Sequence, residues 1–406
     1  MTTPRRQLVF ISVVQVLAMA TWFSASAVVP ALLTEWGISQ TRATWLTASV
    51  QLGFVTGAVL SAVVNLPDRV PAHRLVAVCS LVAAGTTITI AVAVNGLTAA
   101  VVLRFLTGVA LAGVYPPGLR LMASWFDRGR GLALGILVGA LALGSALPQL
   151  VTSFAGLPWR GVLLVAGALA LLGAVIALWR VRPGPLAAPA PPLNPRYVVT
   201  LFRDRGPRLA NLGYLGHMWE LYAMWTWLPA YLAASYAAHG TWGGSRTAVG
   251  LSAFLAIGVA GVAGCLIGGW FGDRFGRART AAWAMATSAT CCLLAMFVYG
   301  LHPLLVIVVL VVWGASVIAD SALFSTCLTQ VVDPRYVGTA LTAQTAAGFL
   351  LTTVTIQAVP YVADHLSWPV AVAALGLGPA VGAYMMGRLH RHLAATASAT
   401  TVEAVI

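Results

Sequence analysis

The sequence predicts an all-α membrane protein with 12 transmembrane helices, arranged as two pseudo-symmetric six-helix bundles around a central cavity. Three observations predict it. Of 406 residues, 60% are hydrophobic and 8% are charged, whereas soluble domains carry about 25% charged residues. The apolar residues form long runs between short charged connections, and segments of the two halves match in order. The net charge of +13 does not indicate a nucleic-acid partner, because the arginines are thin spacers between apolar runs.

Twelve apolar runs are long enough to cross a membrane. A hydrocarbon core about 30 Å thick requires roughly 20 helical residues. The runs are continuously apolar rather than alternating, and a helix satisfies its own backbone polar groups in lipid, so we expect helices and not barrel strands. The predicted spans are residues 8–33, 43–65, 75–95, 98–124, 131–154, 160–179, 208–236, 247–271, 280–300, 303–328, 336–359 and 368–388.

The first run also has features of a cleaved signal peptide, because it follows two arginines and contains a stretch of small residues. Its apolar length exceeds a typical signal core. The eleven further spans need no separate export signal, so the sequence favours a first transmembrane span.

The distribution of arginine predicts the orientation in the membrane. With an even number of spans, both termini lie on one side. Nineteen of the 23 arginines fall on that side, whereas the opposite connections hold only Arg42, Arg160 and Arg246. This bias follows the positive-inside rule. We therefore expect a multi-pass protein of the inner (plasma) membrane whose two termini are cytoplasmic.

An internal repeat predicts the domain organisation. Residues 181–207 are rich in proline and arginine and have no apolar period, which is typical of a linker. The predicted units are therefore residues 1–180, the cytoplasmic linker 181–207, and residues 208–406. Matches at offsets of 199, 205 and 207 support two parallel repeats around a central pathway: Met19 with Met218, Asp68-Arg69 with Asp273-Arg274, and Gly131 with Gly338.

Two motifs carry a resemblance to a known family. The loop after the eighth span, Gly269-Trp-Phe-Gly-Asp273-Arg274-Phe-Gly276-Arg277, resembles the G-x-x-x-D-R-x-G-R signature of the major facilitator superfamily. The first-half copy keeps Asp68 and Arg69 but has Val64 and Pro71 at the glycine positions. Arg104-x-x-x-Gly108 resembles the fourth-span motif of the same superfamily. The resemblance implies a 12-span secondary transporter and leaves the subfamily and the substrate open.

The two loop motifs also have a physical interpretation. An aspartate at a helix end can accept hydrogen bonds from the N-terminal amides of a neighbouring helix, and adjacent arginines can pair with it. Contacts that form in one state and break in another make a latch. We therefore predict that Asp68, Arg69, Asp273, Arg274 and Arg277 gate the pathway. The alternative is that these arginines only set the topology.

Few ionisable residues lie inside the predicted spans. His217 and Glu220 are three residues apart and share a helix face. At 1.5 Å per residue, Glu220 is about 18 Å and Asp320 about 15 Å from the cytoplasmic ends of their spans. Charged groups at such depths are functional candidates. If both helices face one cavity, the three residues form a single protonatable cluster for proton coupling or substrate contact. The alternative is a buried pair that fixes helix packing.

Other polar and aromatic residues are predicted to bind substrate. Arg104 has the donor geometry for an anion, or it ties the fourth span to the first through backbone carbonyls. Gln51 and Thr345 belong to polar stripes with helical spacing. Tyr222 and Trp225 offer a surface for a planar or apolar substrate, although aromatic residues in a membrane helix also serve packing.

These features together predict the function. We expect a secondary active transporter of a small organic solute, coupled to protons and working by alternating access as a monomer in the lipid bilayer. One alternative is a multidrug/proton efflux antiporter, which the absence of an adjacent Gly-Pro pair in the fifth span disfavours. Another is a transport-inactive receptor. No metal-ligand spacing or phosphate loop occurs, so we expect no enzyme activity, no metal and no cofactor.

Overall fold

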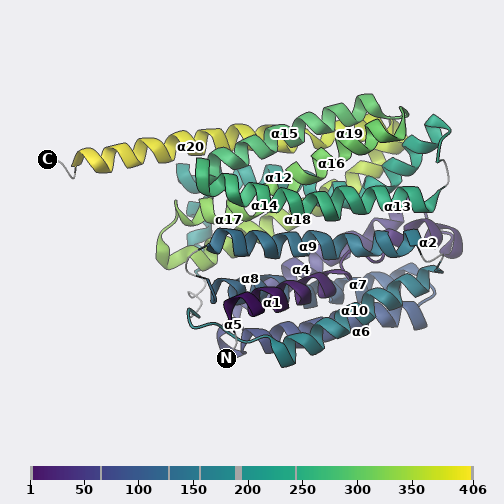
Figure 1. The fold of residues 1–406 in the computed structure, drawn as a ribbon, viewed down its shortest axis with the longest axis horizontal. Helices are drawn as coiled ribbons and strands as arrows, with labels where there is room; N and C mark the ends of the chain where they lie inside the picture. The colour runs from purple at the N-terminus through teal and green to yellow at the C-terminus, as the bar shows by residue number, and fades with distance from the viewer. Residues whose placement is uncertain are drawn as a thin grey trace.

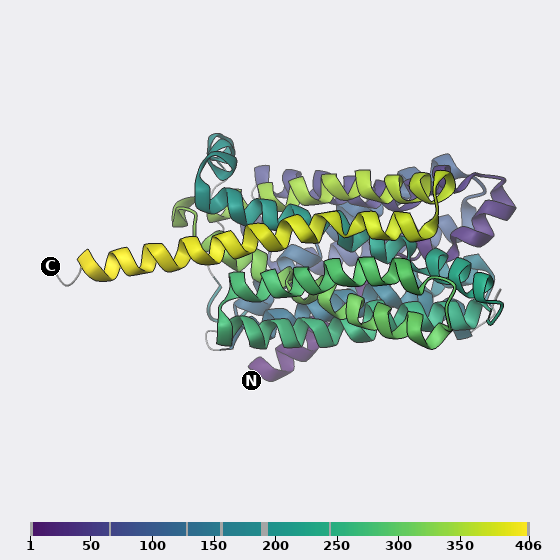
Figure 2. The same cartoon turned by 90° about the horizontal axis from the view of Figure 1, so that it is seen from above.

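The computed structural model describes residues 3–64, 66–126, 129–154, 157–187, 194–242 and 245–403. Within these ranges the regular elements are all helices, and the longer ones run along one common axis (Figure 1). Both ends of the chain lie at the same end of this bundle, which we call the terminal side; the opposite end is the distal side. The final helix extends beyond the bundle on the terminal side (Figure 2). The predicted all-α membrane fold is confirmed.

The first half of the chain forms ten α-helices and one short 3-10 helix before the linker. They are α1 (Pro4–Met19), η1 (Ser26–Val28), α2 (Val29–Trp36), α3 (Gln40–Ala43), α4 (Trp45–Val63), α5 (Leu66–Arg69), α6 (Ala72–Ala93), α7 (Leu97–Leu111), α8 (Tyr115–Ala123), α9 (Arg130–Phe154) and α10 (Trp159–Arg180).

The linker end and the second half form the remaining helices. They are η2 (Pro195–Val199), α11 (Thr200–Arg203), α12 (Arg205–His239), α13 (Arg246–Phe254), the π-helical turn η3 (Leu255–Val259), α14 (Ala260–Phe275), α15 (Arg277–Val298), α16 (Pro303–Ala319), α17 (Ser321–Thr329), η4 (Pro334–Tyr336), α18 (Val337–His365), α19 (Trp368–Leu375) and α20 (Leu377–Glu403).

Ten helical segments of the described chain are long and apolar enough to cross a membrane. Two predicted spans are not among them. The first, residues 8–33, is interrupted after Met19, and the seventh lies in the 35-residue helix α12, which carries Glu220 and several aromatic residues. The count of 12 spans stays a prediction. The ten segments are α3–α4, α6, α7–α8, α9, α10, α13–α14, α15, α16–α17, η4–α18 and α19–α20.

Several spans are broken near their middle. The fourth span is interrupted between α7 and α8, because Pro116 and Pro117 lack the amide that would continue the helix and their rings clash with preceding carbonyls. The tenth span is interrupted at Asp320, between α16 and α17. Val114 and Asp320 are 206 positions apart, within the range of offsets between the repeated segments. The two interruptions therefore occupy corresponding places in the two halves.

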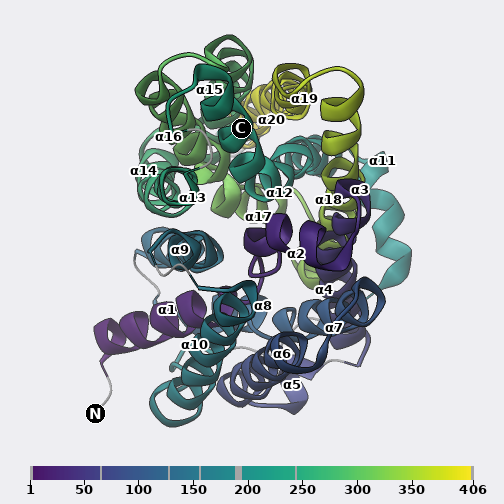
Figure 3. The same cartoon turned by 90° about the vertical axis from the view of Figure 1, so that its right-hand side faces the viewer.

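The two halves of the chain meet along α9 and α4. Seen along the bundle axis, α12–α20 lie on one side and α1–α8 with α10 on the other, with α9 against α13 and α14 (Figure 3). Small residues allow this close approach: a Cβ atom at Gly135 would lie 3.2 Å from the carbonyl oxygen of Cys265, and one at Gly139 would lie 3.4 Å from the Cα atom of Val262. The division at residues 181–207 stays a prediction.

Gly264 and Gly268, four residues apart on α14, bring this helix into close contact with α16. A Cβ atom at Gly264 would lie 2.0 Å from the carbonyl oxygen of Ala315, and one at Gly268 would lie 2.0 Å from that of Ala319. Because these neighbours are backbone atoms, they cannot rotate away. Any side chain at either position therefore pushes the two helices apart.

This packing yields a stability prediction. We expect Gly264→Ala to destabilise the protein by about 1–3 kcal/mol, the usual cost of overpacking a tight contact. The matched control is Gly85→Ala, because a Cβ atom at this helical glycine meets no other atom within 4 Å. It should raise stability by up to about 1 kcal/mol through helix propensity. Thermal unfolding of the two variants in detergent distinguishes these signs, and equal unfolding temperatures would contradict the prediction.

Candidate functional site

A cavity of about 740 Å³ lies between the two halves on the distal side. Both halves contribute its wall, and exposed residues such as Pro158 and Arg246 stand at its edge. The predicted polar stripe of α4 reaches it at Thr44 and Thr47. Trp227, an aromatic residue of the seventh span, also lines the cavity. Residues that were not predicted from the sequence complete much of the wall: Ser26, Gln149, Ser153, Thr226 and Trp368.

The polar part of the cavity wall consists mostly of hydroxyl and amide groups. The hydroxyls of Ser26 and Thr47 are 2.6 Å apart, which links η1 to α4. Among the described residues that line the cavity, Arg246 is the one charged side chain, and no carboxylate is present. The wall therefore offers hydrogen bonds in both directions and a single positive charge at its edge.

An aromatic cluster lies at the centre of the bundle, where the two halves meet. It consists of Trp22, Phe23, Phe54, Tyr222, Trp225 and Phe349. Trp22 and Tyr222 stack across the halves with ring centroids 5.7 Å apart, and Phe54 and Phe349 are 4.4 Å apart. All six side chains are buried. The predicted residues Tyr222 and Trp225 thus belong to a contact between the halves and not to the cavity wall.

Arg104 holds the break in the first span. Its Nη1 donates to the carbonyl oxygen of Thr21 at 2.7 Å, its Nη2 donates to that of Trp22, and its Nε donates to that of Leu46 at 3.2 Å. The side chain is completely buried. Because α1 ends at Met19, the carbonyl oxygens of Thr21 and Trp22 lie beyond the end of the helix, where Arg104 supplies their donors. In this structure Arg104 ties the fourth span to the first and second, and it does not reach the cavity.

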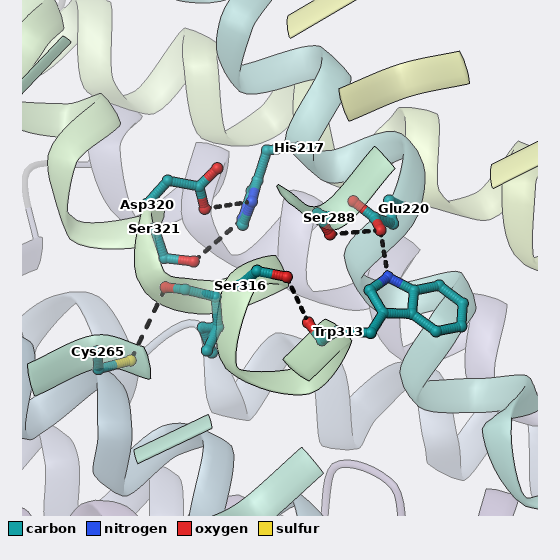
Figure 4. Close-up of polar contacts among 9 residues, drawn as sticks. His217, Glu220, Cys265, Ser288, Trp313, Ser316, Asp320 and Ser321 are labelled. Atoms are coloured by element: carbon teal, nitrogen blue, oxygen red, sulfur yellow. Dashed lines mark hydrogen bonds and ion pairs between the residues drawn. The ribbon is translucent and has the colours of Figure 1, made fainter. Parts of the chain in front are cut away.

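His217 and Asp320 form a buried pair at the break between α16 and α17 (Figure 4). His217 Nδ1 lies 2.9 Å from Asp320 Oδ1, and Nε2 lies 3.1 Å from the hydroxyl oxygen of Ser321. Both side chains are at most 3% exposed. The helix break allows this arrangement, because it places Asp320 and Ser321 on either side of the imidazole.

Glu220 occupies a separate polar site one turn further along α12. Its Oε1 atom accepts hydrogen bonds from the hydroxyl of Ser288 at 2.7 Å and the indole N–H of Trp313 (Figure 4). It also accepts one from the thiol of Cys292 at 3.1 Å. The side chain is 1% exposed. Helices α15 and α16 supply all three donors, none of which was predicted from the sequence.

The structure therefore corrects one expectation. His217, Glu220 and Asp320 were predicted to form a single cluster, but His217 pairs with Asp320 while Glu220 is held by other donors. The reason is position along the helix. His217 meets Asp320 and Ser321 at the break after α16, whereas Glu220, three residues further along α12, meets Ser288, Cys292 and Trp313.

The loop after α14 meets the start of α9 on the terminal side. The carboxylate oxygens of Asp273 lie 3.2 and 3.3 Å from the position that a Cβ atom of Gly131 would occupy. Gly131 is in the first turn of α9, so a carboxylate of one half stands at a helix N-terminus of the other. Arg69 and Arg274 are exposed and Arg277 is half-buried. The side chain of Asp68 lies outside the described part of the structure.

Two further predicted site residues do not line the cavity. Gln51 is completely buried on α4, one turn below the cavity residue Thr47. Thr345 is half-buried on α18, one turn before Gly348, whose backbone packs against the ring of Tyr214. Whether either residue binds substrate stays a prediction.

Comparisons with known proteins agree with this architecture. A sequence model described as Major Facilitator Superfamily matches residues 11–356. A stretch of 162 residues is 27% identical to a probable L-galactonate transporter of Escherichia coli (strain K12), and it spans 35% of this chain and only 36% of that relative. The fold is similar to the crystal structure of a mutant of the nucleoside transporter NupG, with a TM-score of 0.71, 15% identity, and coverage of 95% of this chain and 100% of that chain. The chain belongs to the Major Facilitator Superfamily.

Proposed function

We propose that this protein is a secondary active transporter that moves a small organic solute together with protons by alternating access. The observation that carries the proposal is the cavity between the two halves, which reaches the distal surface and ends above the aromatic cluster. A solute can enter such a cavity from one side only. Rearrangement of the halves around the cluster would then open the other side.

In this proposal the observed conformation is the distal-open state of the cycle. On the terminal side, α9 packs tightly against α14 through Gly135 and Gly139. The carboxylate of Asp273 at the first turn of α9 adds a favourable charge–dipole interaction to that contact. We infer that Asp273, with Arg274 and Arg277, acts as a latch that stabilises closure of the terminal side. Asp68 and Arg69 form the weaker copy in the first half.

Asp320 with His217, and Glu220, are the proposed proton-coupling groups. A charged side chain in the membrane interior costs about 2.5–3.5 kcal/mol on insertion scales, so buried acids persist there when they have a role. A proton removes the charge of a carboxylate, and histidine changes charge near neutral pH. Asp320 sits at a helix break, where a change of charge can alter the angle between α16 and α17.

The proposed substrate is a neutral or anionic organic molecule. The described cavity wall offers one arginine and no carboxylate, so it lacks a partner for a cationic solute. The partial match to a probable L-galactonate transporter is consistent with a small organic solute. The absence of a cation-binding group also weighs against a multidrug antiporter for cationic drugs.

We further propose the orientation that the arginines predict. The structure has Arg42, Arg160 and Arg246 in α3 and at the starts of α10 and α13, on the distal side. Under the positive-inside rule, the terminal side with both chain ends is then cytoplasmic and the cavity faces outward. We expect a monomer in the inner membrane.

Reconstitution into liposomes tests the proposed function. A thermal-shift screen of purified protein identifies a solute that binds, and radiolabelled uptake of that solute is then followed with and without an imposed pH gradient. We expect accumulation above the equilibrium level only with the gradient, and its loss when a protonophore is added. Equal uptake under all three conditions would reject proton coupling.

The latch yields a separate prediction that uses a native thiol. Cys265 is buried where α14 meets α9, so it becomes accessible when the terminal side opens. Removing a charge–dipole interaction worth about 0.3–1 kcal/mol should raise the population of the open form about two- to fivefold. We therefore expect Asp273→Asn to increase the rate at which a maleimide labels Cys265 by this factor, measured by mass spectrometry. An unchanged labelling rate would leave Asp273 without a role in closure.

A further inference from the structure

Three buried polar side chains at the centre of the molecule have no hydrogen-bond partner in the described part of the chain. Neither Oε1 nor Nε2 of Gln51 is bonded, although the side chain is completely buried. The indole nitrogens of Trp22 and Trp225 are also buried and unbonded. Buried polar groups in proteins are nearly always hydrogen-bonded. Unbonded groups also occur elsewhere in the described chain, as at Ser80 and Thr280. Gln51, Trp22 and Trp225 differ in that they lie on segments from both halves that meet at the aromatic cluster, which makes them candidates for binding a ligand.

These three residues lie at the boundary between the cavity and the aromatic cluster. On α4, Thr47 lines the cavity, Gln51 follows one turn deeper, and Phe54 joins the cluster one turn further. The same order occurs on α12, where Thr226 lines the cavity and Trp225 belongs to the cluster. Both halves thus contribute unbonded polar atoms to the layer below the cavity, although none of the three residues lines its wall.

The chemistry of the three residues defines a type of ligand. A carboxamide presents a donor and an acceptor side by side in one plane, so its best complement is a planar group with an adjacent acceptor and donor. The rings of Trp22 and Tyr222 are 26° from parallel, and those of Phe23 and Tyr222 are 17° from parallel. A flat ring can extend such a stack.

The charges nearby favour an uncharged ligand. The guanidinium of Arg104 is occupied by the three backbone carbonyls of Thr21, Trp22 and Leu46. Oε1 of Glu220 is already bonded to donors from α15 and α16. The described cavity wall above has no carboxylate. A charged ligand bound beside Gln51, Trp22 and Trp225 would therefore lack a side chain of opposite charge to pair with.

We propose that Gln51, Trp22 and Trp225 form the substrate-recognition subsite, and that it takes an uncharged planar ring carrying an adjacent N–H and C=O. This inference rests on the proposed transport function and names the class of its substrate. The ligand enters from the cavity, separates Trp22 from Tyr222, and bonds to the amide of Gln51. Recognition thereby loosens a contact that joins the two halves.

Calorimetric titration of the purified full-length protein tests the subsite. The probes are uracil, 2-pyridone and nicotinamide, with 1,3-dimethyluracil as a ring without N–H groups and D-galactonate as a charged, non-planar solute. We expect at least one of the three planar probes to bind, and its affinity to fall at least fivefold in Gln51→Met. Dimethyluracil should not bind, because a site built to hydrogen-bond rejects an analogue that lacks the group.

Gln15 provides a matched control, because it is also buried and its Nε2 is also unbonded. It lies elsewhere, beside Gly118 on α8. Gln15→Met should bind the probes with the affinity of the wild type. Trp225→Phe, which keeps a ring and removes the N–H, provides a second variant if Gln51→Met does not fold. The proposal is overturned if no planar probe binds, if Gln51→Met lowers affinity less than fivefold, or if galactonate binds and depends on Gln51.

The two proposals fail in different ways. If a planar probe binds through Gln51 but a pH gradient drives no accumulation of it, the transport function is wrong and the subsite stands. If a gradient drives accumulation of another solute to the same extent in the wild type and in Gln51→Met, the subsite is wrong and the transport function stands.

Discussion

Replacing Asp320 by asparagine is expected to abolish gradient-driven accumulation of the transported solute while leaving the protein folded. One pH unit corresponds to about 1.4 kcal/mol, which supports roughly tenfold accumulation when one proton accompanies one solute. Asparagine keeps an oxygen that can accept from His217 Nδ1, now 2.9 Å from Asp320 Oδ1, but it cannot take up a proton. Uptake should therefore stop when the solute concentrations inside and outside the liposomes are equal. The measurement is uptake into proteoliposomes under an inward proton gradient.

The same argument applies to Glu220→Gln, because the amide oxygen can still accept from Ser288, Cys292 and Trp313. The matched control is Asp333→Asn, which changes a partly exposed acid next to η4. Hydrogen bonds from Arg335 lower the pKa of the Asp333 carboxyl, so this group stays ionised throughout the neutral range. It should not take part in coupling. Full accumulation in both Asp320→Asn and Glu220→Gln would exclude these residues as coupling groups.

Replacing Arg104 by alanine is expected to have the second largest effect, on stability as well as on transport. The change removes the donors to the carbonyls of Thr21, Trp22 and Leu46 in a buried place. Each buried carbonyl left without a partner costs about 1–3 kcal/mol. The break in the first span would lose its anchor, and Trp22 and Phe23 would lose their positions in the aromatic cluster. Thermal unfolding and solute binding measure the two effects.

Two further variants make this prediction specific. Arg104→Lys keeps the charge but has one nitrogen instead of a planar fork, so it cannot reach carbonyls on two helices at once. We expect it to fold with reduced stability and weak binding. Arg160→Ala removes a half-exposed arginine that also bonds to a backbone carbonyl, that of Ala91 at 2.8 Å. It should change stability by less than about 1 kcal/mol, in the range of surface contacts. If Arg160→Ala lost as much stability as Arg104→Ala, the buried position of Arg104 would have no special role.

The sequence predicted the helices well, because the bilayer directly requires apolar spans of a minimum length and charged residues in the connections between them. The predicted limits of the fifth span, 131–154, differ from α9 by one residue. The interruption after Met19 was not predicted. No proline or charge marks residues 20–25, and the break depends on Arg104, a residue 80 positions away. A local sequence pattern does not reveal a helix break that depends on a contact with a residue far away in the chain.

The candidate site was predicted in part. The intramembrane acids stand out in the sequence because charge is rare there, and the structure places them one turn apart beside α12. Their partners could not be predicted, because Ser288, Cys292 and Trp313 are ordinary residues in a membrane helix until packing brings them to Glu220. The cavity wall was likewise only partly predicted. Its polar residues come from many helices, and no single helix shows a complete stripe.

Distances across the two ends of the molecule, measured as a function of pH, test proton-driven alternating access most directly. Spin labels at the exposed positions Thr41 and His239 report the distal side, and labels at Arg74 and Arg279 report the terminal side. We expect a change of pH to shift the two distances in opposite directions, and the shift to vanish in the double variant Asp320→Asn, Glu220→Gln. Distances that do not respond to pH, or that change in the same direction at both ends, would contradict the account.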